Sequence, residues 1–461
     1  MSKGRKLGKD FGLLTIGNFA SRILSFFLVP LYTSILTTEE YGIIDIICTT
    51  VNLVYPIASV VISEAVIRFC LEKENDKRQV WTIAVLITLV GCVGMILLSP
   101  LILLTRFKAY VVFFILHGIT MTCNATVSQF VKGNNEVAVY AIGGVINTIV
   151  VISLNIVFLI LCNLGLIGYL LALVLGHIAA MSYYFVRMSL WKFFIPLHMI
   201  DKKLGKRMVQ YAAPMIPNSI SWWISDSSDK YIVQHFCGLA VNGIYAVAYK
   251  IPSMLTTVSN LFISAWQLSA FEDFKTDEAK RFFSKVSTEF MSFILLVAGG
   301  LILMTRPIAY VLYAKEFFQA WQYTPTLILA FVFSTVSSFW GTVYTAAKKT
   351  KLLFYSTMAA AWINIVLDIV LTPRIGAMGA AIATMISYFV ICAIRIVESR
   401  KIIILDVDWT RIIISLLLVG AEVLVISDSM LSFGTCAALW MTMLIINREM
   451  IVVIAKKVLR K

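Results

Sequence analysis

The sequence predicts an all-α polytopic membrane protein of about 14 transmembrane helices. Hydrophobic residues make up 60% of the 461 residues and charged residues 14%, whereas a soluble domain carries about 25% charged residues. Apolar runs of about 20 residues, the length that crosses a hydrocarbon core, follow one another along the chain. Helices and closed barrels are the structures that satisfy the backbone in lipid, and the alternating strands of a barrel do not occur.

Each apolar run defines one predicted span. In chain order the spans lie at about 11–36, 42–70, 80–104, 110–131, 137–161, 166–187, 211–236, 243–271, 286–313, 323–346, 352–372, 377–397, 409–427 and 433–454. The loops between them are no longer than about 25 residues, which leaves no room for a soluble catalytic domain. An enzyme is therefore not expected.

The chain repeats itself weakly, with an offset of about 200 residues. Four matches occur in the same order: Gly42 with Gly243, Pro100 with Pro307, "LNIV" with "LDIV", and "GLIG" with "GAMG". Each copy would hold an even number of spans, so the copies share their orientation. The repeat predicts two six-helix lobes related by a pseudo-two-fold axis along the membrane normal, as in one class of transporters.

The repeat also sets the expected domain limits. The N-terminal lobe is expected at 1–190 and the C-terminal lobe at 211–400. A basic amphipathic linker at 191–210 would lie between them at the membrane surface. The last two helices and a basic tail, at 401–461, fall outside the repeat.

The basic residues indicate the orientation. About 27 Lys and Arg residues fall in the segments that are inside if the N-terminus is inside, against about 4 outside. We therefore expect a multi-pass protein of the cytoplasmic membrane with both termini in the cytoplasm. The net charge of +14 is spread over every inner loop, which argues against a nucleic-acid partner. The eight cysteines form no CxxC pair, so thiol-bound metal is not expected.

Two basic residues lie inside predicted spans. Arg22 lies near the middle of the first span with Asn18 one turn before it, and Lys250 directly follows Tyr249 in the eighth. A charge inside the membrane is costly and usually faces a cavity or a partner. Arg22 and Lys250 are therefore candidate donors to an anionic substrate. The alternative is a buried ion pair, for example between Arg22 and a carboxylate of the second span.

Four aromatic residues of the seventh and eighth spans are candidates for the wall of a substrate cavity. They are Trp222, Trp223, Tyr249 and Trp266.

The seventh span contains "SWWISDSSDKYIV", with Asp226 and Asp229 near its middle. In the eleventh, Asn364 and Asp368 are four residues apart and share one helix face. Thr384 projects from the twelfth span, whose glycines and alanines permit close helix approach. Two carboxylates, an amide and a hydroxyl are hard-oxygen groups that suit a sodium ion or a proton. A purely structural polar network is the alternative.

The chain resembles the polysaccharide (O-antigen type) flippases of the multidrug/oligosaccharidyl-lipid/polysaccharide exporter superfamily. The resembling segments are "NFASRILSFFLVPLYTSILTTEEYGI", "AAPMIPNSISWWISDSSDKYIV", "GIYAVAYKIPSML", "KEFFQAWQYTP" and "NIVLDIVLTPRIGAMGAAIAT". The resemblance implies a MATE-like fold whose lobes form a V-shaped cavity with alternating access. It also implies movement of an undecaprenyl-pyrophosphate-linked oligosaccharide from the inner to the outer leaflet.

The resemblance also implies roles for single residues. The related lipid II flippases have a cationic cavity whose helix 1 "SR" motif is similar to Ser21-Arg22 and whose basic residue before the helix 8 proline is similar to Lys250. Their second helix 1 arginine is replaced here, near Leu28.

Some relatives have a sodium site, and this chain has matching residues for it. They are Asp229, Asn364, Asp368 and Thr384, with Asp226 as a substitute for Asp229. A coupling Na⁺ or H⁺ is the one cofactor expected.

Other functions remain open. A cation-coupled multidrug exporter of the same superfamily would favour an acidic or apolar cavity without Arg22 and Lys250, and a flippase for a peptidoglycan or teichoic acid precursor is a further alternative. A membrane-embedded glycosyltransferase would need an acidic metal-binding pair in a large loop. The expected partners are the lipid-linked oligosaccharide, membrane lipids, and the polymerase and glycosyltransferases of the same pathway.

Overall fold

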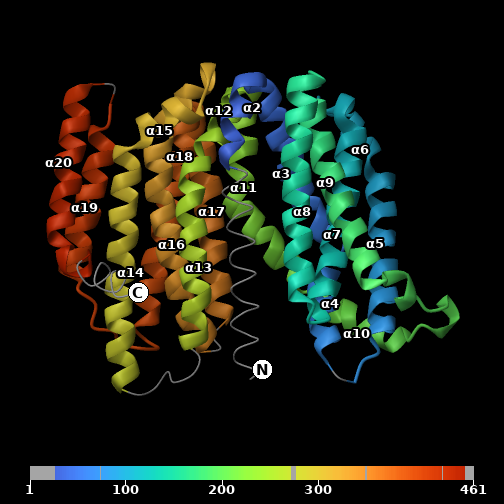
Figure 1. Ribbon diagram of the computed structural model, residues 1–461. Coiled ribbons are helices and arrows are strands. Elements are labelled where there is room, and N and C mark those ends of the chain that lie inside the picture. The colour runs from blue at the N-terminus through green and yellow to red at the C-terminus, as the bar shows by residue number, and fades with distance from the viewer. Residues whose placement is uncertain (1–25, 73, 271–276, 348–349, 428, 452–461) are drawn as a thin grey trace. The chain divides into compact units, whose positions relative to one another are not determined.

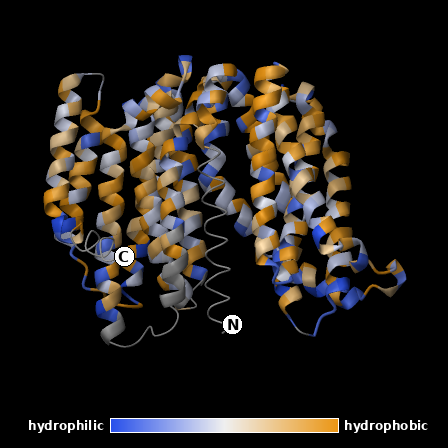
Figure 2. Ribbon diagram, viewed as in Figure 1, coloured by the Kyte–Doolittle hydropathy of each residue, from blue (hydrophilic) through white to orange (hydrophobic). Residues whose placement is uncertain are grey.

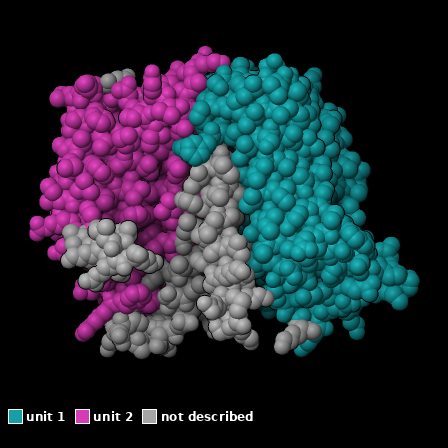
Figure 3. Space-filling view, in the orientation of Figure 1, with its two compact units in different colours: residues 1–227 teal, residues 228–461 magenta. Residues whose placement is uncertain are grey.

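The computed structural model describes residues 26–72, 74–270, 277–347, 350–427 and 429–451. Helices account for nearly all of these ranges, and no strand occurs within them (Figure 1). The chain divides into two compact units, Met1–Ser227 and Ser228–Lys461 (Figure 3). The boundary lies inside α11 (Met215–Cys237). The all-helical prediction is confirmed, while the domain limits drawn from the repeat stay a prediction.

Unit 1 is built from α2 to α10 and the first part of α11. The helices are α2 (Val29–Ile35), α3 (Thr38–Ala58), α4 (Ile62–Leu71), α5 (Lys77–Leu98), α6 (Pro100–Leu103), α7 (Val111–Gly133), α8 (Val137–Ile156), α9 (Gly165–Met188) and α10 (Lys202–Ala212).

Unit 2 is built from the end of α11 and from α12 to α20. The helices are α12 (Leu239–Ala248), α13 (Lys250–Ala270), α14 (Asp277–Leu303), α15 (Thr305–Leu312), α16 (Thr324–Ala346), α17 (Thr350–Ile375), α18 (Ala377–Ser399), α19 (Trp409–Val425) and α20 (Met430–Ile446).

The helices carry the apolar surface that a bilayer requires. Nine helices in the described ranges are long and apolar enough to cross a membrane. Hydrophobic residues run along α5 in unit 1 and along α20 in unit 2 (Figure 2). The chain is thus a multi-pass membrane protein, and the total of about 14 spans stays a prediction.

The span predicted at about 42–70 consists of two helices, α3 and α4. Thr37 and Glu40 form a capping box at the start of α3, and Pro56, which lacks a backbone donor, lies near its end. Val60 and Val61 then adopt left-handed φ angles of 52° and 51°. Both helices are apolar, so hydropathy alone does not reveal the break. The span predicted at about 243–271 is likewise divided, into α12 and α13.

The structure explains why glycine occurs at the matching positions of the internal repeat in both units. Gly165 opens α9 with a φ of 52° and Gly376 precedes α18 with a φ of 64°, a conformation that glycine adopts without strain. Three residues after each lies a glycine at a close approach. A Cβ on Gly168 would lie 2.8 Å from the Cβ of Phe158, and one on Gly379 would lie 2.6 Å from the carbonyl carbon of Leu371.

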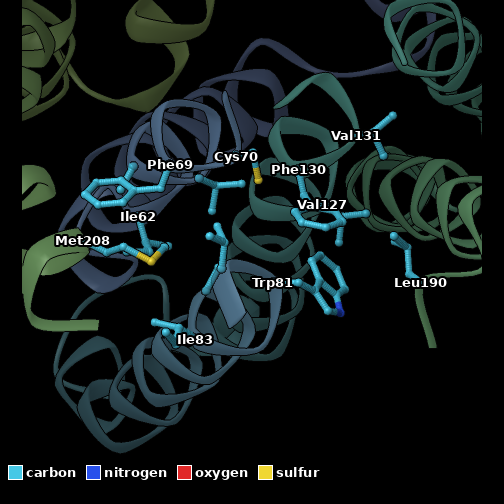
Figure 4. Close-up of a cluster of buried hydrophobic side chains, with 14 of the residues drawn as sticks. Ile62, Phe69, Cys70, Trp81, Ile83, Val127, Phe130, Val131, Leu190 and Met208 are labelled. Carbon is cyan, nitrogen blue, oxygen red and sulfur yellow. The ribbon is translucent and has the colours of Figure 1, made fainter. Parts of the chain in front are cut away.

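The core of unit 1 is a cluster of buried side chains from α4, α5, α7, α9 and α10 (Figure 4). Trp81 and Phe130 are both fully buried, with ring centroids 4.7 Å apart. The amphipathic helix α10 contributes Leu204 and Met208 to this cluster. Burying such side chains contributes about 1.5–3 kcal/mol each to stability. The apolar face of α10 therefore fixes this basic segment to α4 and α5.

Two polar networks join helices within unit 2. The Arg395 side chain of α18 is buried and donates to Ser356 Oγ at 3.2 Å, to the Ser337 carbonyl at 3.0 Å and to Thr357 Oγ1 at 3.0 Å. These bonds join α18 to α16 and α17. In the second network Arg411 of α19 donates to Asn447 Oδ1 at 2.7 Å.

Candidate functional site

Asp229 is the acidic residue that α11 contributes to the interior of unit 2. Its side chain is 3% exposed, and Val233, one turn further along the helix, is 0% exposed. Residues four apart lie on one helix face, so this face of α11 is buried. Burial of an ionisable group requires partners.

Three hydroxyl groups supply these partners. Tyr245 donates to Asp229 Oδ2 at 3.0 Å, and Tyr249 donates to the same oxygen. Thr384 of α18 donates to Oδ2 at 3.5 Å. Asp229 Oδ1 accepts the backbone N–H of Lys230 at 2.9 Å, and the ammonium of Lys230 lies 5.9 Å from the ring centroid of Tyr249. Asp229 is therefore held in one position as a hydrogen-bond acceptor.

The facing helix α17 presents a buried polar stripe. Asn364, Asp368 and Thr372 follow at intervals of four residues and are 2%, 0% and 1% exposed. Asn364 donates to Thr384 Oγ1 at 3.4 Å and accepts from Ser228 Oγ at 3.3 Å. The close approach of α17 and α18 at Gly379 brings this stripe to Thr384.

Asp368 has no comparable support. Among the described residues, neither of its carboxyl oxygens has a hydrogen-bond partner. Asp229 is close enough to act on it electrostatically, as a like charge. Burying an unpaired carboxylate costs several kcal/mol, and a neighbouring like charge adds to that cost. A bound cation or proton would remove the cost.

The residues present fit a hard monovalent cation or a proton. The oxygens of Asp229, Asp368, Asn364 and Thr384 are of the type that alkali and alkaline-earth ions prefer. In the described ranges, no three residues of the His, Cys, Asp and Glu types form a metal-binding group. The nitrogen and sulfur ligands of a zinc centre are thus not assembled in that part of the chain.

The predicted sodium-site residues thus lie together on α11, α17 and α18. Their role stays a prediction. Asp226, the substitute, is exposed, so Asp229 is the carboxylate that joins this group.

The other predicted site residues have different surroundings. Asn18 and Arg22 lie outside the described residues, as does the side chain of Trp266. Lys250 is the first residue of α13 and is half-buried. Their roles in substrate binding stay predictions.

The predicted aromatic residues are not equivalent. Trp222 is 41% exposed. The Trp223 indole donates to the Thr49 carbonyl of α3 at 2.8 Å. The Tyr249 hydroxyl donates to Asp229, so Tyr249 belongs to the acidic cluster whether or not it also lines a cavity.

Sequence reasoning missed Tyr245, Ser228 and Thr372. Tyr245 is fully buried and lies one turn before Tyr249. The available signal was this four-residue spacing in an apolar helix, together with a membrane carboxylate that needs donors. Thr372 extends the Asn364–Asp368 spacing by one more turn.

Comparison with known proteins identifies the family. The family model described as "Polysaccharide biosynthesis protein" matches residues 7–267, more than half of the chain. No curated protein matches the sequence.

The solved structures that are similar to this chain include two transporters and a flippase. An inward-facing multidrug resistance MATE family transporter of the MOP superfamily has a TM-score of 0.68 at 13% identity, covering 82% of this chain and 94% of its own. The lipid II flippase MurJ in an inward closed conformation has a TM-score of 0.67 at 16% identity, covering 95% and 99%. A MOP superfamily transporter from Pyrococcus furiosus has a TM-score of 0.54 at 13% identity, covering 85% and 95%.

These likenesses show the fold that the chain shares with these proteins. Together with the family match, they establish that the chain belongs to the polysaccharide biosynthesis protein family and has the MATE-like fold of the MOP superfamily.

Proposed function

We propose that the protein is a flippase that moves an undecaprenyl-pyrophosphate-linked oligosaccharide across the cytoplasmic membrane by alternating access. Transport is coupled to a cation, Na⁺ or H⁺, bound by Asp229, Asn364, Asp368 and Thr384. Both termini lie in the cytoplasm, as the excess of basic residues in inner loops indicates.

The observation that carries this proposal is that a polysaccharide-biosynthesis family and a lipid-flippase fold coincide in one chain. The family match concerns glycan synthesis, and the flippase of similar fold is named for a lipid-linked substrate. A charged, hydrated head group cannot cross hydrocarbon unaided. A pathway that builds a glycan on a lipid at the inner face therefore needs a protein of this kind, next to its glycosyltransferases and polymerase.

The acidic cluster supports coupling to a cation. A cation at Asp368 would neutralise a buried carboxylate that lacks hydrogen-bond partners. The same ion would reduce the repulsion between Asp368 and Asp229. A cation gradient can drive transport if the ion binds one conformation of the protein more tightly than the other.

The anionic end of the substrate requires cationic donors. Lys250 and Arg22 would bind the pyrophosphate, with Asn18 beside Arg22. Trp222, Trp223, Tyr249 and Trp266 would contact the sugars, because aromatic rings present large apolar faces with a polar edge. The lipid tail would stay in the bilayer.

A multidrug exporter is the second candidate, because the fold matches a MATE family transporter with a TM-score of 0.68. The two candidates differ in substrate charge. An exporter of cationic drugs gains nothing from Lys250, whereas a pyrophosphate carrier depends on it.

The test is a flipping assay with the purified full chain in proteoliposomes. The substrate is an undecaprenyl pyrophosphate that carries a fluorescent oligosaccharide, and a membrane-impermeant quencher reports the leaflet. Wild-type protein is expected to expose the internal pool, and Lys250→Ala to lose this activity. Lys206→Ala, an exposed basic residue on α10, is the matched control.

Dye efflux from the same vesicles is measured in parallel. Efflux without flipping would replace the proposal with the exporter. Equal flipping by Lys250→Ala and wild type would remove Lys250 from the substrate site.

A further inference from the structure

A second buried acid lies in unit 2, outside the cluster on α11, α17 and α18. Glu422 of α19 is 0% exposed. Neither of its carboxyl oxygens has a hydrogen-bond partner among the described residues. Nothing in the proposed transport cycle uses this side chain.

The carboxyl group of Glu422 fits a space that a glycine provides. A Cβ on Gly299 of α14 would lie 3.0 Å from Glu422 Oε2, 2.8 Å from Met443 Cε and 3.1 Å from Trp440 Cδ1. The Trp440 indole is directed elsewhere, to the Leu296 carbonyl at 3.0 Å. The Glu422 carboxyl group therefore lies against α14 at Gly299, and the side chains of Met443 and Trp440 from α20 approach the same glycine.

The charged and titratable groups around Glu422 are few. From Ser292 to Leu303, α14 has no ionisable side chain, α16 has Tyr344 alone, and α20 has Cys436. The Cys436 thiol contacts the Glu422 carbonyl oxygen at 3.9 Å.

Two basic residues of this region are engaged with other groups. On α19, Arg411 lies three turns earlier and pairs with Glu289 of α14 at 3.4 Å. Beyond the helix end, Arg306 of α15 donates to the Ser427 carbonyl at 3.5 Å.

An ionised carboxylate in such a setting is costly, since nothing nearby in the described structure compensates its charge. The neutral, protonated acid is the form that the packing accommodates. Loss of the proton would place a bare charge between α19, α20 and α14. The three helices would then separate, or water would enter to solvate the charge.

A pocket lies next to the helices that enclose Glu422. Its volume is about 440 Å³, and residues of α14, α15 and α20 line it, with Arg306 as a basic lining residue and a polar rim at Ser427 and Ser429. Two of the lining residues are Leu303, one helical turn after Gly299, and Ile426, one helical turn after Glu422. A turn rises about 5.4 Å, and Cys436, which also lines the pocket, contacts the Glu422 carbonyl oxygen.

We propose that Glu422 is a second proton-binding site of this protein, reached through this pocket, and that its bound proton holds the α19–α20 pair against α14. The site is separate from the candidate coupling site, and it operates whatever substrate the protein transports.

Cys436 provides a built-in reporter. It lines the pocket, lies against Glu422 and is 1% exposed. The full chain in lipid nanodiscs is alkylated with iodoacetamide between about pH 6 and about pH 9, and the Cys436 peptide is quantified by mass spectrometry. Because thiols ionise in this range, each rate is compared with that of Glu422→Gln at the same pH. Glutamine has the same shape but cannot lose a proton.

The Cys436 rate of wild type, divided by that of Glu422→Gln, is expected to rise about tenfold over this range. A ratio independent of pH overturns the proposal. Glu422→Met is an apolar substitute if the glutamine variant does not fold. The wild-type protein also gives a test without any variant. If the alkylation rate of Cys436 rises with pH only as much as the ionisation of a free thiol predicts, the proton-controlled opening is refuted.

Discussion

The hydroxyl of Tyr245 donates a hydrogen bond to Oδ2 of Asp229, with 3.0 Å between the two oxygens. Tyr249, four residues later at the end of α12, donates to the same oxygen. Hydrogen bonds to a carboxylate stabilise its charged form. Asp368 has no hydrogen-bond partner in the described structure. The two acids are thus unequal: Asp229 is fixed by its donors, and Asp368 is the group that most needs a cation or a proton.

Replacing Tyr245 with Phe should weaken this arrangement. The change removes one donor to Asp229 and leaves the ring, so we expect the free energy of unfolding to fall by about 1–3 kcal/mol. The melting temperature of the purified protein in detergent measures the effect. Tyr355→Phe is the matched control, because Tyr355 of α17 is 65% exposed. Equal melting temperatures for the two variants would contradict a stabilising bond to Asp229.

Replacing Asp368 with Asn should remove the response to the coupling ion. An ion that binds the folded state alone stabilises it by RT ln(1 + [ion]/Kd), about 2.7 kcal/mol at a hundredfold excess over Kd. Wild-type protein should therefore melt at a higher temperature in sodium chloride than in choline chloride, or at lower pH if the ion is a proton. The variant should show neither shift.

The control for Asp368→Asn is the melting temperature in choline chloride at constant pH. It should not fall in the variant, because a buried unpaired carboxylate is replaced by a neutral amide. A variant with the full ionic response of wild type would show that Asp368 does not bind the ion.

Helix periodicity was sufficient to place Asn364 and Asp368 on one face of a helix, because residues four apart share a face. It could not show that this face meets Thr384 or Asp229, and their grouping was a hypothesis from the chemistry of the side chains that the family resemblance also implied. Tyr245 escaped notice because an aromatic residue in an apolar helix looks like packing. Hydropathy also missed the break at Val60, since the chain is apolar on both sides of it, and it could not show that Glu422 faces α14.

Replacing Gly379 with Ala should disturb the acidic cluster from a distance. The new Cβ would lie 2.6 Å from the Leu371 carbonyl carbon and 2.7 Å from its oxygen. These are backbone atoms, so α17 and α18 would have to move apart, at a cost of about 1–3 kcal/mol. Both the melting temperature and the sodium-dependent shift should fall. Gly420→Ala on α19 is the control, since its Cβ would meet no atom within 4 Å and alanine favours helix.

The left-handed backbone between α3 and α4 predicts opposite preferences at two neighbouring positions. Val60 has a φ of 52°, where a side chain costs about 1–2 kcal/mol that glycine avoids. Ala is the reference residue at this position. Glycine has more freedom in the unfolded chain, which offsets part of its advantage. Val60→Gly should therefore be more stable than Val60→Ala by up to about 1 kcal/mol. At Ala58, the last residue of α3, the same exchange of Ala for Gly should lower stability by up to about 1 kcal/mol. Melting temperatures of the three variants and the wild type measure both differences. If glycine is the less stable choice at both positions, the break between α3 and α4 does not store the strain that its φ angles indicate.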